Sequence, residues 1–277
     1  MLRHSSGTRY GDCTNLAISR DKTIFTQLQR AIEEKLVNAE GKPYAVFDFD
    51  NTCIVNDIAE ATLAHLCGHE LLRDNTLLGA ADDSSEYHAR VFRTYYELLE
   101  KKKHKAAYML CARMFSGYTP GEAEATTLAA ITEEGVRIGS KVLYDIHIER
   151  GLGARREILE VINYLRSKGV SIWIVSASAE PAVRAAARHF GIDANVIGVR
   201  SALEDRIFTS KLLEPLPMFE GKVECIRSYI NSTHAPILAA GDSMNDLAML
   251  EAAKIRVVVD KKNDLTHIAR ESGWFIV

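Results

Sequence analysis

Short apolar runs alternate with amphipathic stretches through the second half of the chain. Apolar runs at residues 170–175, 196–199, 237–240 and 256–259 have the length and composition of buried strands. Between and after them, residues 155–168, 180–190, 222–231, 245–253 and 264–271 show helical spacing of apolar positions. Strands that alternate with helices predict an α/β fold in which helices flank a central parallel sheet.

The first half contributes one further strand and a long helical segment. Residues 21–38 are predicted to form a helix with Asp21 as its N-cap, and residues 44–48 form a buried strand. Residues 54–148 read as almost entirely helical. We therefore predict an N-terminal arm (1–20), a core domain (21–53 and 150–277) and an inserted, all-helical cap domain (54–149). Residues 200–213 are expected to form a hairpin or an irregular excursion.

Composition and charge exclude several classes of protein. The 277 residues carry a net charge of −3, which argues against a general nucleic-acid-binding protein. No stretch reaches the length of about 20 apolar residues that spans a membrane, and the N-terminus has no signal-like apolar region. The five cysteines are scattered without a CxxC pair. We expect a cytoplasmic protein with a small-molecule partner; the sequence does not specify an oligomeric state.

Polar residues gather where the predicted strands end. The first strand ends in Asp48-Phe49-Asp50-Asn51-Thr52, the 170–175 strand in Ser176, and the 237–240 strand in the segment Gly241 to Asp246. Lys222 opens a helix nearby in the predicted topology. Ligands of open α/β sheets bind beyond the carboxyl ends of the strands, so these side chains are expected to share one site.

This mixture of side chains suits phosphoryl transfer. Asp48, Asp50, Asp242 and Asp246 cannot all be ionised in one cleft without a counter-charge. Oxygen ligands fit Mg²⁺, hydroxyls and a lysine fit phosphate oxygens, and a carboxylate can attack phosphorus. Each piece alone is also common at turns and helix caps. The order and the strand-end placement of all four segments favour the functional interpretation.

These segments resemble the four motifs of the haloacid dehalogenase superfamily of phosphatases. The motifs are matched by Asp48-Phe49-Asp50-Asn51-Thr52, Val175-Ser176, Gly221-Lys222 and Gly241-Asp242-Ser243-Met244-Asn245-Asp246. The resemblance covers about residues 44–259 and implies a Rossmann-like core. The position of the helical insert is similar to that of the cap in the phosphoserine-phosphatase-like branch.

The resemblance implies a role for each motif residue. Asp48 would be the nucleophile, and Asp50 the general acid and then the general base. Thr52, Ser176 and Lys222 would bind the phosphoryl group. Mg²⁺ would be held by Asp48, the backbone carbonyl of Asp50 and Asp242, while Asp246 would orient a metal-bound water or Lys222.

Substrate recognition is expected from the start of the insert. Asp57 and Glu60 are three residues apart and share a helix face. They form either a solvated acidic first turn or a site for a cationic substrate group. Phosphoserine phosphatases carry a glutamate at the Asp57 position, and the Asp57…Glu60 spacing also resembles phosphorylcholine phosphatases. Aromatic residues of the insert would suit a choline group; alternatively Arg90, Arg93 and Arg113 would meet a substrate carboxylate.

The sequence therefore predicts an Mg²⁺-dependent phosphomonoesterase that acts on a small phosphoserine- or phosphocholine-like metabolite through an aspartyl-phosphate. The alternatives are a phosphotransferase of the same fold, with an acceptor other than water, and a non-catalytic binding protein. The histidines are interpreted as surface or core residues, because none has an evident metal-ligand spacing.

Overall fold

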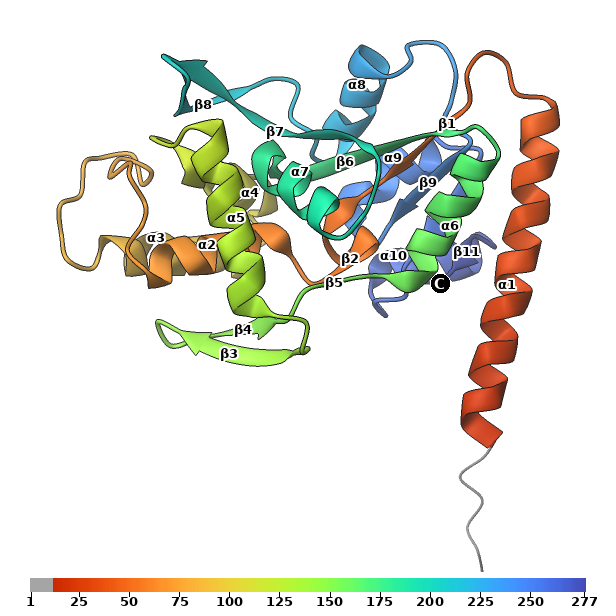
Figure 1. Cartoon of the computed structure of the whole chain (residues 1–277), viewed down its shortest axis with the longest axis horizontal. Helices are drawn as coiled ribbons and strands as arrows, with labels where there is room; N and C mark the ends of the chain where they lie inside the picture. The colour runs from red at the N-terminus through yellow and green to blue at the C-terminus, as the bar shows by residue number, and fades with distance from the viewer. Residues whose placement is uncertain (1–11) are drawn as a thin grey trace, which may run out of the picture.

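The computed structural model describes residues 12–277, and side chains from residue 23 onward (Figure 1). Its centre is a seven-stranded sheet in the order β11-β10-β9-β1-β6-β7-β8. All neighbouring strands run parallel except β7 and β8, so the predicted α/β core is confirmed. The strands are β1 (Tyr44–Phe47), β6 (Ser171–Ala179), β7 (Asn195–Glu204), β8 (Ile207–Leu213), β9 (Leu238–Gly241), β10 (Ile255–Val258) and β11 (Phe275–Ile276).

Helices cover both faces of the sheet, as the continuous apolar character of β1 requires. Successive side chains of a strand point to opposite faces. Ala45 and Phe47 accordingly join one hydrophobic cluster and Tyr44 and Val46 another. The first cluster includes residues of α1 (Asp12–Val37), α6 (Arg156–Ser167) and α7 (Glu180–His189). The second includes residues of α8 (Glu220–Tyr229), α9 (Leu247–Glu251) and α10 (Asp264–Glu271).

The insert between β2 and β5 is not all-helical, so that part of the prediction is wrong. It contains α2 (Ile58–Gly68), α3 (Tyr87–Glu100), α4 (His104–Ala112) and α5 (Pro120–Glu134), followed by a hairpin of β3 (Gly139–Leu143) and β4 (Ile146–Arg150). The hairpin escaped prediction because it is largely exposed: Ile148 is its only buried residue. The insert leaves and rejoins the core where β2 (Ile54–Val55) pairs with β5 (Gly153–Ala154). Figure 1 shows it on one side of the sheet.

Two further expectations are revised. The first helix begins at Asp12 and not at Asp21, so residues 12–20 of the predicted arm are helical, while residues 1–11 lie outside the described residues. The segment 200–213, left open between a hairpin and an irregular excursion, is the antiparallel β7–β8 pair.

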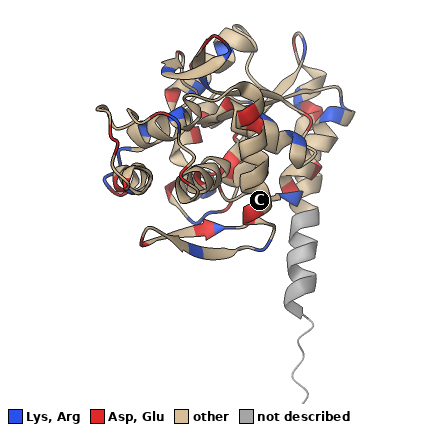
Figure 2. Cartoon of the chain, turned by 60° about the vertical axis from the view of Figure 1, so that its left-hand side comes forward, with Lys and Arg blue, Asp and Glu red and all other residues tan. Residues whose placement is uncertain are grey.

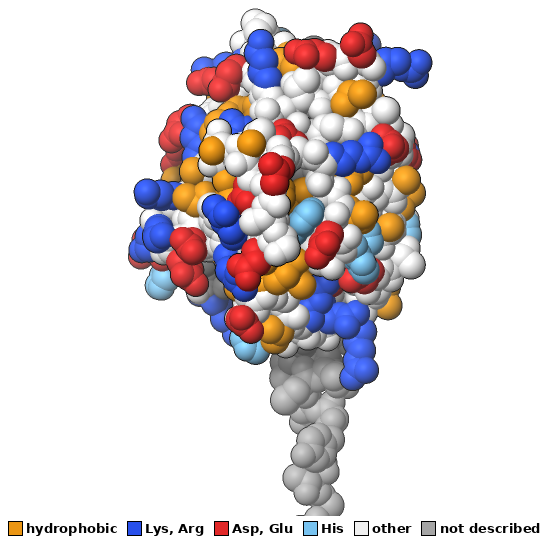
Figure 3. Space-filling view, turned by 90° about the vertical axis from the view of Figure 1, so that its left-hand side faces the viewer, with side chains coloured by type: hydrophobic (Ala, Val, Ile, Leu, Met, Phe, Trp, Pro, Cys, Tyr) orange, Lys and Arg blue, Asp and Glu red, His pale blue; other side chains and the backbone are white. Residues whose placement is uncertain are grey.

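Charged side chains of both signs are interspersed over the surface. Figure 2 shows lysine and arginine beside aspartate and glutamate on most elements, and Figure 3 shows the same mixture on the face turned toward the viewer. Within residues 12–277, no helix has both the length and the apolar composition that a membrane span needs.

We predict that Asn56 fastens the insert to the core. Its side-chain amide donates hydrogen bonds to the carbonyl oxygens of Arg150 (3.1 Å) and Gly151 (2.9 Å), and its φ angle is +62°. Asn56→Ala leaves both carbonyls without this donor and places alanine in a left-handed conformation. It should lower the free energy of unfolding by about 1–3 kcal/mol in a denaturant titration.

The matched control is Asn163→Ala, at an exposed position of α6. Alanine has the higher helix propensity there, so stability should change by less than about 0.5 kcal/mol. Equal stability of the Asn56 variant and the wild-type protein would show that these hydrogen bonds contribute nothing.

Candidate active site

The central strands deliver the predicted site residues to one edge of the sheet. β1 lies between β6 and β9, and all three run parallel. Asp48 follows β1 directly, Ser176 and Ser178 lie near the end of β6, and Asp242 follows β9. The structure therefore brings distant residues into one group, as the topology predicts; Thr52 and Asp242, which are hydrogen-bonded, are 190 positions apart.

Lys222 forms the centre of this group. Its ammonium nitrogen lies 2.6 Å from Oδ1 of Asp48 and 2.6 Å from Oδ1 of Asp246, and the residue has no exposed surface. Burial alone lowers the pKa of a lysine, but the two carboxylates outweigh it and raise the pKa of Lys222. Lys222 is thus a fixed positive charge beside Asp48.

Both carboxylate oxygens of Asp246 accept hydrogen bonds, one from α8 and one from its own loop. While Oδ1 accepts from Lys222, Oδ2 accepts from the backbone N–H groups of Asp242 (3.0 Å) and Ser243 (3.1 Å). This fold-back requires glycine at 241, because a Cβ atom there would lie 2.5 Å from the Cβ of Asp246. Asp246 therefore shapes the loop after β9 and holds Lys222 in place.

Asp50 is held by a different set of donors. Its Oδ1 accepts from the backbone N–H of Ile58 (2.7 Å), and its Oδ2 accepts from the hydroxyls of Ser178 (2.6 Å) and Ser176 (3.4 Å). Burial, followed by repulsion from Asp57, raises the pKa of Asp50 to about 8. A carboxyl group of this kind carries a proton at neutral pH.

Sequence reasoning missed Ser178. Residues two apart in a strand share a face, so the serine two positions after Ser176 was the available signal. The backbone N–H of Ser178 also donates to the hydroxyl of Ser176 (3.1 Å), which links the two serines to one another as well as to Asp50.

Three carboxylates at the edge could hold a metal ion. Oxygen atoms of Asp48, Asp242 and Asp246 lie within 4.8 Å of one another, and the Thr52 hydroxyl donates to Oδ1 of Asp242 (3.3 Å). Burial and the negative charge of Asp246 raise the pKa of Asp48 to about 7 and that of Asp242 to about 8. Lys222 alone thus leaves an excess of negative charge, and an oxygen-rich group of this kind fits a hard divalent cation.

Asp57 and Glu60 have separate environments at the start of α2. Oδ1 of Asp57 caps the helix by accepting from the N–H groups of Ala59 (2.7 Å) and Glu60 (2.9 Å). The carboxylate of Glu60 accepts from the hydroxyls of Tyr95 and Tyr96, each at 3.2 Å. Burial and the charge of Glu60 raise the pKa of Asp57 to about 8, and burial also raises the pKa of Glu60.

A single cavity joins the insert to the sheet edge. It has a volume of about 300 Å³ and is lined by both sets of carboxylates. From the core come Asp48, Asp50, Asn51, Ser176, Ala177, Ser178, Asp242, Ser243 and Asn245; from the insert come Asp57, Ala59, Glu60, Tyr95, Leu99, His104, Tyr108, Cys111 and Ala112. The cavity is therefore acidic at both ends and partly aromatic toward the insert.

The predicted arginines of the insert lie elsewhere. Arg90 pairs with Asp82, Arg93 lies over the ring of Tyr144, and Arg113 donates to the carbonyl of Ser210. None of the three lines the cavity among the described residues. Of the aromatic residues of the insert, Tyr95 and Tyr108 line it.

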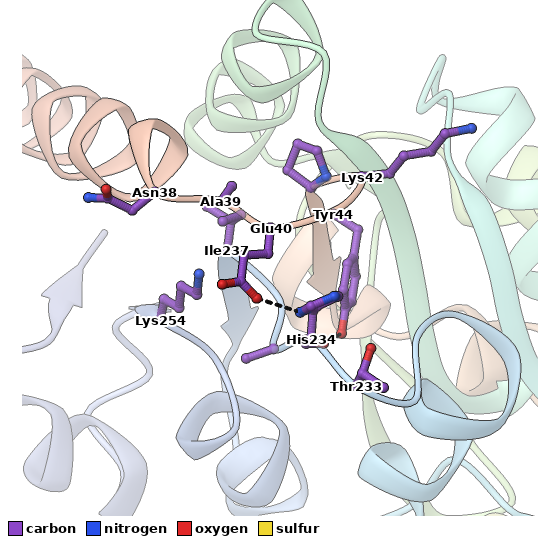
Figure 4. A pocket seen from close by; sticks show the side chains of 11 residues that line it. Asn38, Ala39, Glu40, Lys42, Tyr44, Thr233, His234, Ile237 and Lys254 are labelled. Atoms are coloured by element: carbon purple, nitrogen blue, oxygen red, sulfur yellow. Dashed lines mark hydrogen bonds and ion pairs between the residues drawn. The ribbon is translucent and has the colours of Figure 1, made fainter.

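A second cavity of about 300 Å³ lies where β1 begins, at the opposite end of that strand from Asp48 (Figure 4). Glu40 and His234 face one another in it at 3.7 Å, and the hydroxyl of Tyr44 donates to the carbonyl of His234 (2.7 Å). Its lining does not include the predicted site residues.

Comparison with known proteins finds similar sequences and similar folds. A phosphorylcholine phosphatase of Pseudomonas aeruginosa is 28% identical over 261 residues, which cover 78% of this chain and 72% of that protein. A protein of unknown function from Anaerococcus prevotii has a similar structure, with a TM-score of 0.65, 20% identity and coverage of 85% of both chains. A substrate-bound phosphoserine phosphatase has a TM-score of 0.53 and 16% identity, over 86% of this chain and 94% of that one.

The family comparison covers the core and the insert together. The sequence pattern of the haloacid dehalogenase-like hydrolases matches residues 45–251, which include all four predicted motifs. The chain therefore belongs to the haloacid dehalogenase-like hydrolase family.

Proposed function

We propose that this enzyme is an Mg²⁺-dependent phosphatase that hydrolyses a small phosphomonoester with a cationic leaving group, through an aspartyl-phosphate. The main support is the placement of Asp48 and Asp50 in one cavity, where the buried Lys222 pairs with Asp48 but not with Asp50, whose pKa is raised to about 8. The two carboxyl groups are thus prepared for different tasks, one as a nucleophile and one as a proton carrier.

Asp48 would attack phosphorus with Oδ2, because Oδ1 is engaged by Lys222. The bond between phosphorus and the ester oxygen breaks, and the proton of Asp50 passes to the leaving alcohol. Asp50 then accepts a proton from the water that attacks the aspartyl-phosphate, which releases phosphate and regenerates Asp48. Thr52, Ser176 and Lys222 would bind the phosphoryl oxygens during both steps.

Asp48, Asp242 and the backbone carbonyl of Asp50 would hold Mg²⁺, with Asp246 supporting the site through Lys222. The ion would neutralise charge on the phosphoryl group. The excess of buried negative charge beyond Lys222 supports this assignment.

The insert end of the cavity supports the proposed substrate class. Glu60 lies there with the aromatic residues Tyr95 and Tyr108, whereas no arginine lines the cavity among the described residues. An anionic group beside aromatic rings favours an alkylammonium group over a carboxylate. The phosphorylcholine phosphatase of P. aeruginosa, whose named substrate carries such a group, supports a phosphocholine-like substrate; a phosphoserine-like substrate would need a cationic partner for its carboxylate.

The nucleophile is tested with Asp48→Asn. An amide cannot form the aspartyl-phosphate, so turnover of 4-nitrophenyl phosphate in Mg²⁺ should fall by at least about a thousandfold. The control is Asp145→Asn in the exposed β3–β4 turn, which should keep full activity. Wild-type enzyme should lose activity in EDTA and regain it with Mg²⁺. Activity of Asp48→Asn equal to that of the control would exclude covalent catalysis by Asp48.

The general acid is tested with Asp50→Asn on two leaving groups. An alkyl alkoxide needs a proton to leave, whereas 4-nitrophenolate does not, so kcat/KM should fall at least about tenfold more for an alkyl phosphate than for the aryl phosphate. Since the pKa of Asp50 is about 8, the wild-type rate with the alkyl phosphate should decrease as the pH rises through about 8. Equal losses for both substrates would contradict this role.

The cationic subsite is tested with Glu60→Gln, which removes the charge and keeps the shape. KM for phosphocholine should rise about tenfold, equivalent to about 1.4 kcal/mol, while KM for the neutral isostere 3,3-dimethylbutyl phosphate should change less than about twofold. Phosphocholine and its isostere differ only in the charge of the head group. An equal change for both would show that Glu60 does not recognise a cation.

A further inference from the structure

A second cluster of metal-ligating side chains lies on the insert, outside the cavity. His65 belongs to the last turn of α2, and His69 is the residue that ends this helix, four positions later. Glu133 lies in the last turn of α5. Its Oε2 atom is 2.6 Å from Nδ1 of His65 and 3.0 Å from Nε2 of His69. The expectation that the histidines lack ligand spacing is therefore wrong for this pair.

Three ligand atoms converge on one point in this cluster. The imidazole rings are 4.7 Å apart between centroids, and the two nitrogens and the carboxylate oxygen lie within 4.8 Å of one another. Both imidazoles meet the same oxygen of Glu133, and neither ring is assigned another hydrogen bond among the described residues. A cation between the three atoms would use all three lone pairs at once.

We propose that His65, His69 and Glu133 form a Zn²⁺ site that joins the C-terminal ends of α2 and α5. Two imidazoles and one carboxylate are a ligand set of borderline softness, which favours Zn²⁺ over Mg²⁺. A tetrahedral ion with bonds of about 2.1 Å needs its ligand atoms about 3.4 Å apart. The two nitrogen–oxygen separations, 2.6 and 3.0 Å, must therefore increase by about 0.4 to 0.8 Å.

The exposed ligand side chains can move by this amount, while the backbone that carries them is fixed by hydrogen bonds. The side chains of His69 and Glu133 are 55% and 43% exposed, so they can turn and leave a fourth coordination position to water, whereas that of His65 is 13% exposed. The backbone is held on both sides: Arg150 donates to the carbonyls of Glu133 and Glu134, and Tyr144 donates to the carbonyl of Cys67.

The site differs in place and in ligand chemistry from the carboxylate cluster. Glu60, which faces the cavity, precedes His65 by five residues, or about 7.5 Å along the helix axis. Zn²⁺ at the far end would connect α2 to α5 and so fix the helix that carries Asp57 and Glu60. The proposed ion is a structural one and takes no part in the phosphatase reaction.

The test measures Zn²⁺ binding and thermal stability in the full chain, with Mg²⁺ in excess to compete for the carboxylate cluster. The wild-type protein should bind one Zn²⁺ per chain in calorimetry, and its melting temperature should rise with Zn²⁺ by mass action. His69→Ala should weaken this binding at least tenfold and remove the rise. His147→Ala, at an exposed histidine of the β3–β4 hairpin, should preserve both.

Co²⁺ provides a second readout that does not depend on stability. The wild-type protein loaded with Co²⁺ should show the visible absorption of a site with nitrogen ligands, and His69→Ala should lose it. Equal Zn²⁺ affinity and equal Co²⁺ spectra in the His69 variant and the wild-type protein would overturn the proposal. Loss of both in the His147 variant would also overturn it, because binding would then be a property of surface histidines in general.

Discussion

The arrangement of the whole site depends on the buried ion pairs of Lys222. A lysine without exposed surface is stable only if its charge is fully compensated, and Asp48 and Asp246 provide that compensation at 2.6 Å each. The three residues belong to the loop after β1, to α8 and to the loop after β9. Moving any one of these segments would leave a buried charge unpaired. The ion pairs therefore fix the relative position of the segments that carry the proposed nucleophile and the proposed metal ligands.

The same electrostatic balance connects the insert to the chemistry. Asp50 accepts a hydrogen bond from the backbone N–H of Ile58, the first residue of α2. The proposed acid is thereby joined to the helix whose first turn carries Glu60. Repulsion from Asp57, which caps the same helix, contributes to the raised pKa of Asp50. A shift of α2 would alter both the cavity and the protonation of Asp50, so the proposed recognition and proton transfer would be coupled through one helix.

Much of the fold and the site could be predicted because apolar runs and strand ends are local signals. The apolar run at residues 44–47 predicts β1. The rule that ligands of parallel sheets bind beyond the carboxyl ends of the strands predicts the edge where Asp48, Ser176 and Asp242 meet. What escaped prediction depends on contacts between distant segments or on exposed structure. The β3–β4 hairpin has one buried residue, and its alternation of apolar and polar residues is confined to positions 146–149. Its two-residue turn, Tyr144-Asp145, lacks the usual Asn-Gly signal although both φ angles are positive. His65 meets Glu133 across 68 residues, a separation that no local spacing indicates.

The contrast between Asp57 and Glu60 shows why spacing alone left their role open. Two acidic residues on one helix face are compatible with a helix cap and with a binding site, and the structure assigns one residue to each environment. Oδ1 of Asp57 accepts hydrogen bonds from two backbone N–H groups, as the side chain of an N-cap residue does. The carboxylate of Glu60 accepts from no backbone N–H among the described residues; two tyrosine hydroxyls at the cavity hold it. A helix cap needs one acceptor oxygen and no cavity, whereas recognition of a cation needs a negative charge that lies in a cavity. Of the two residues, only Glu60 places a carboxylate in the cavity without also capping the helix.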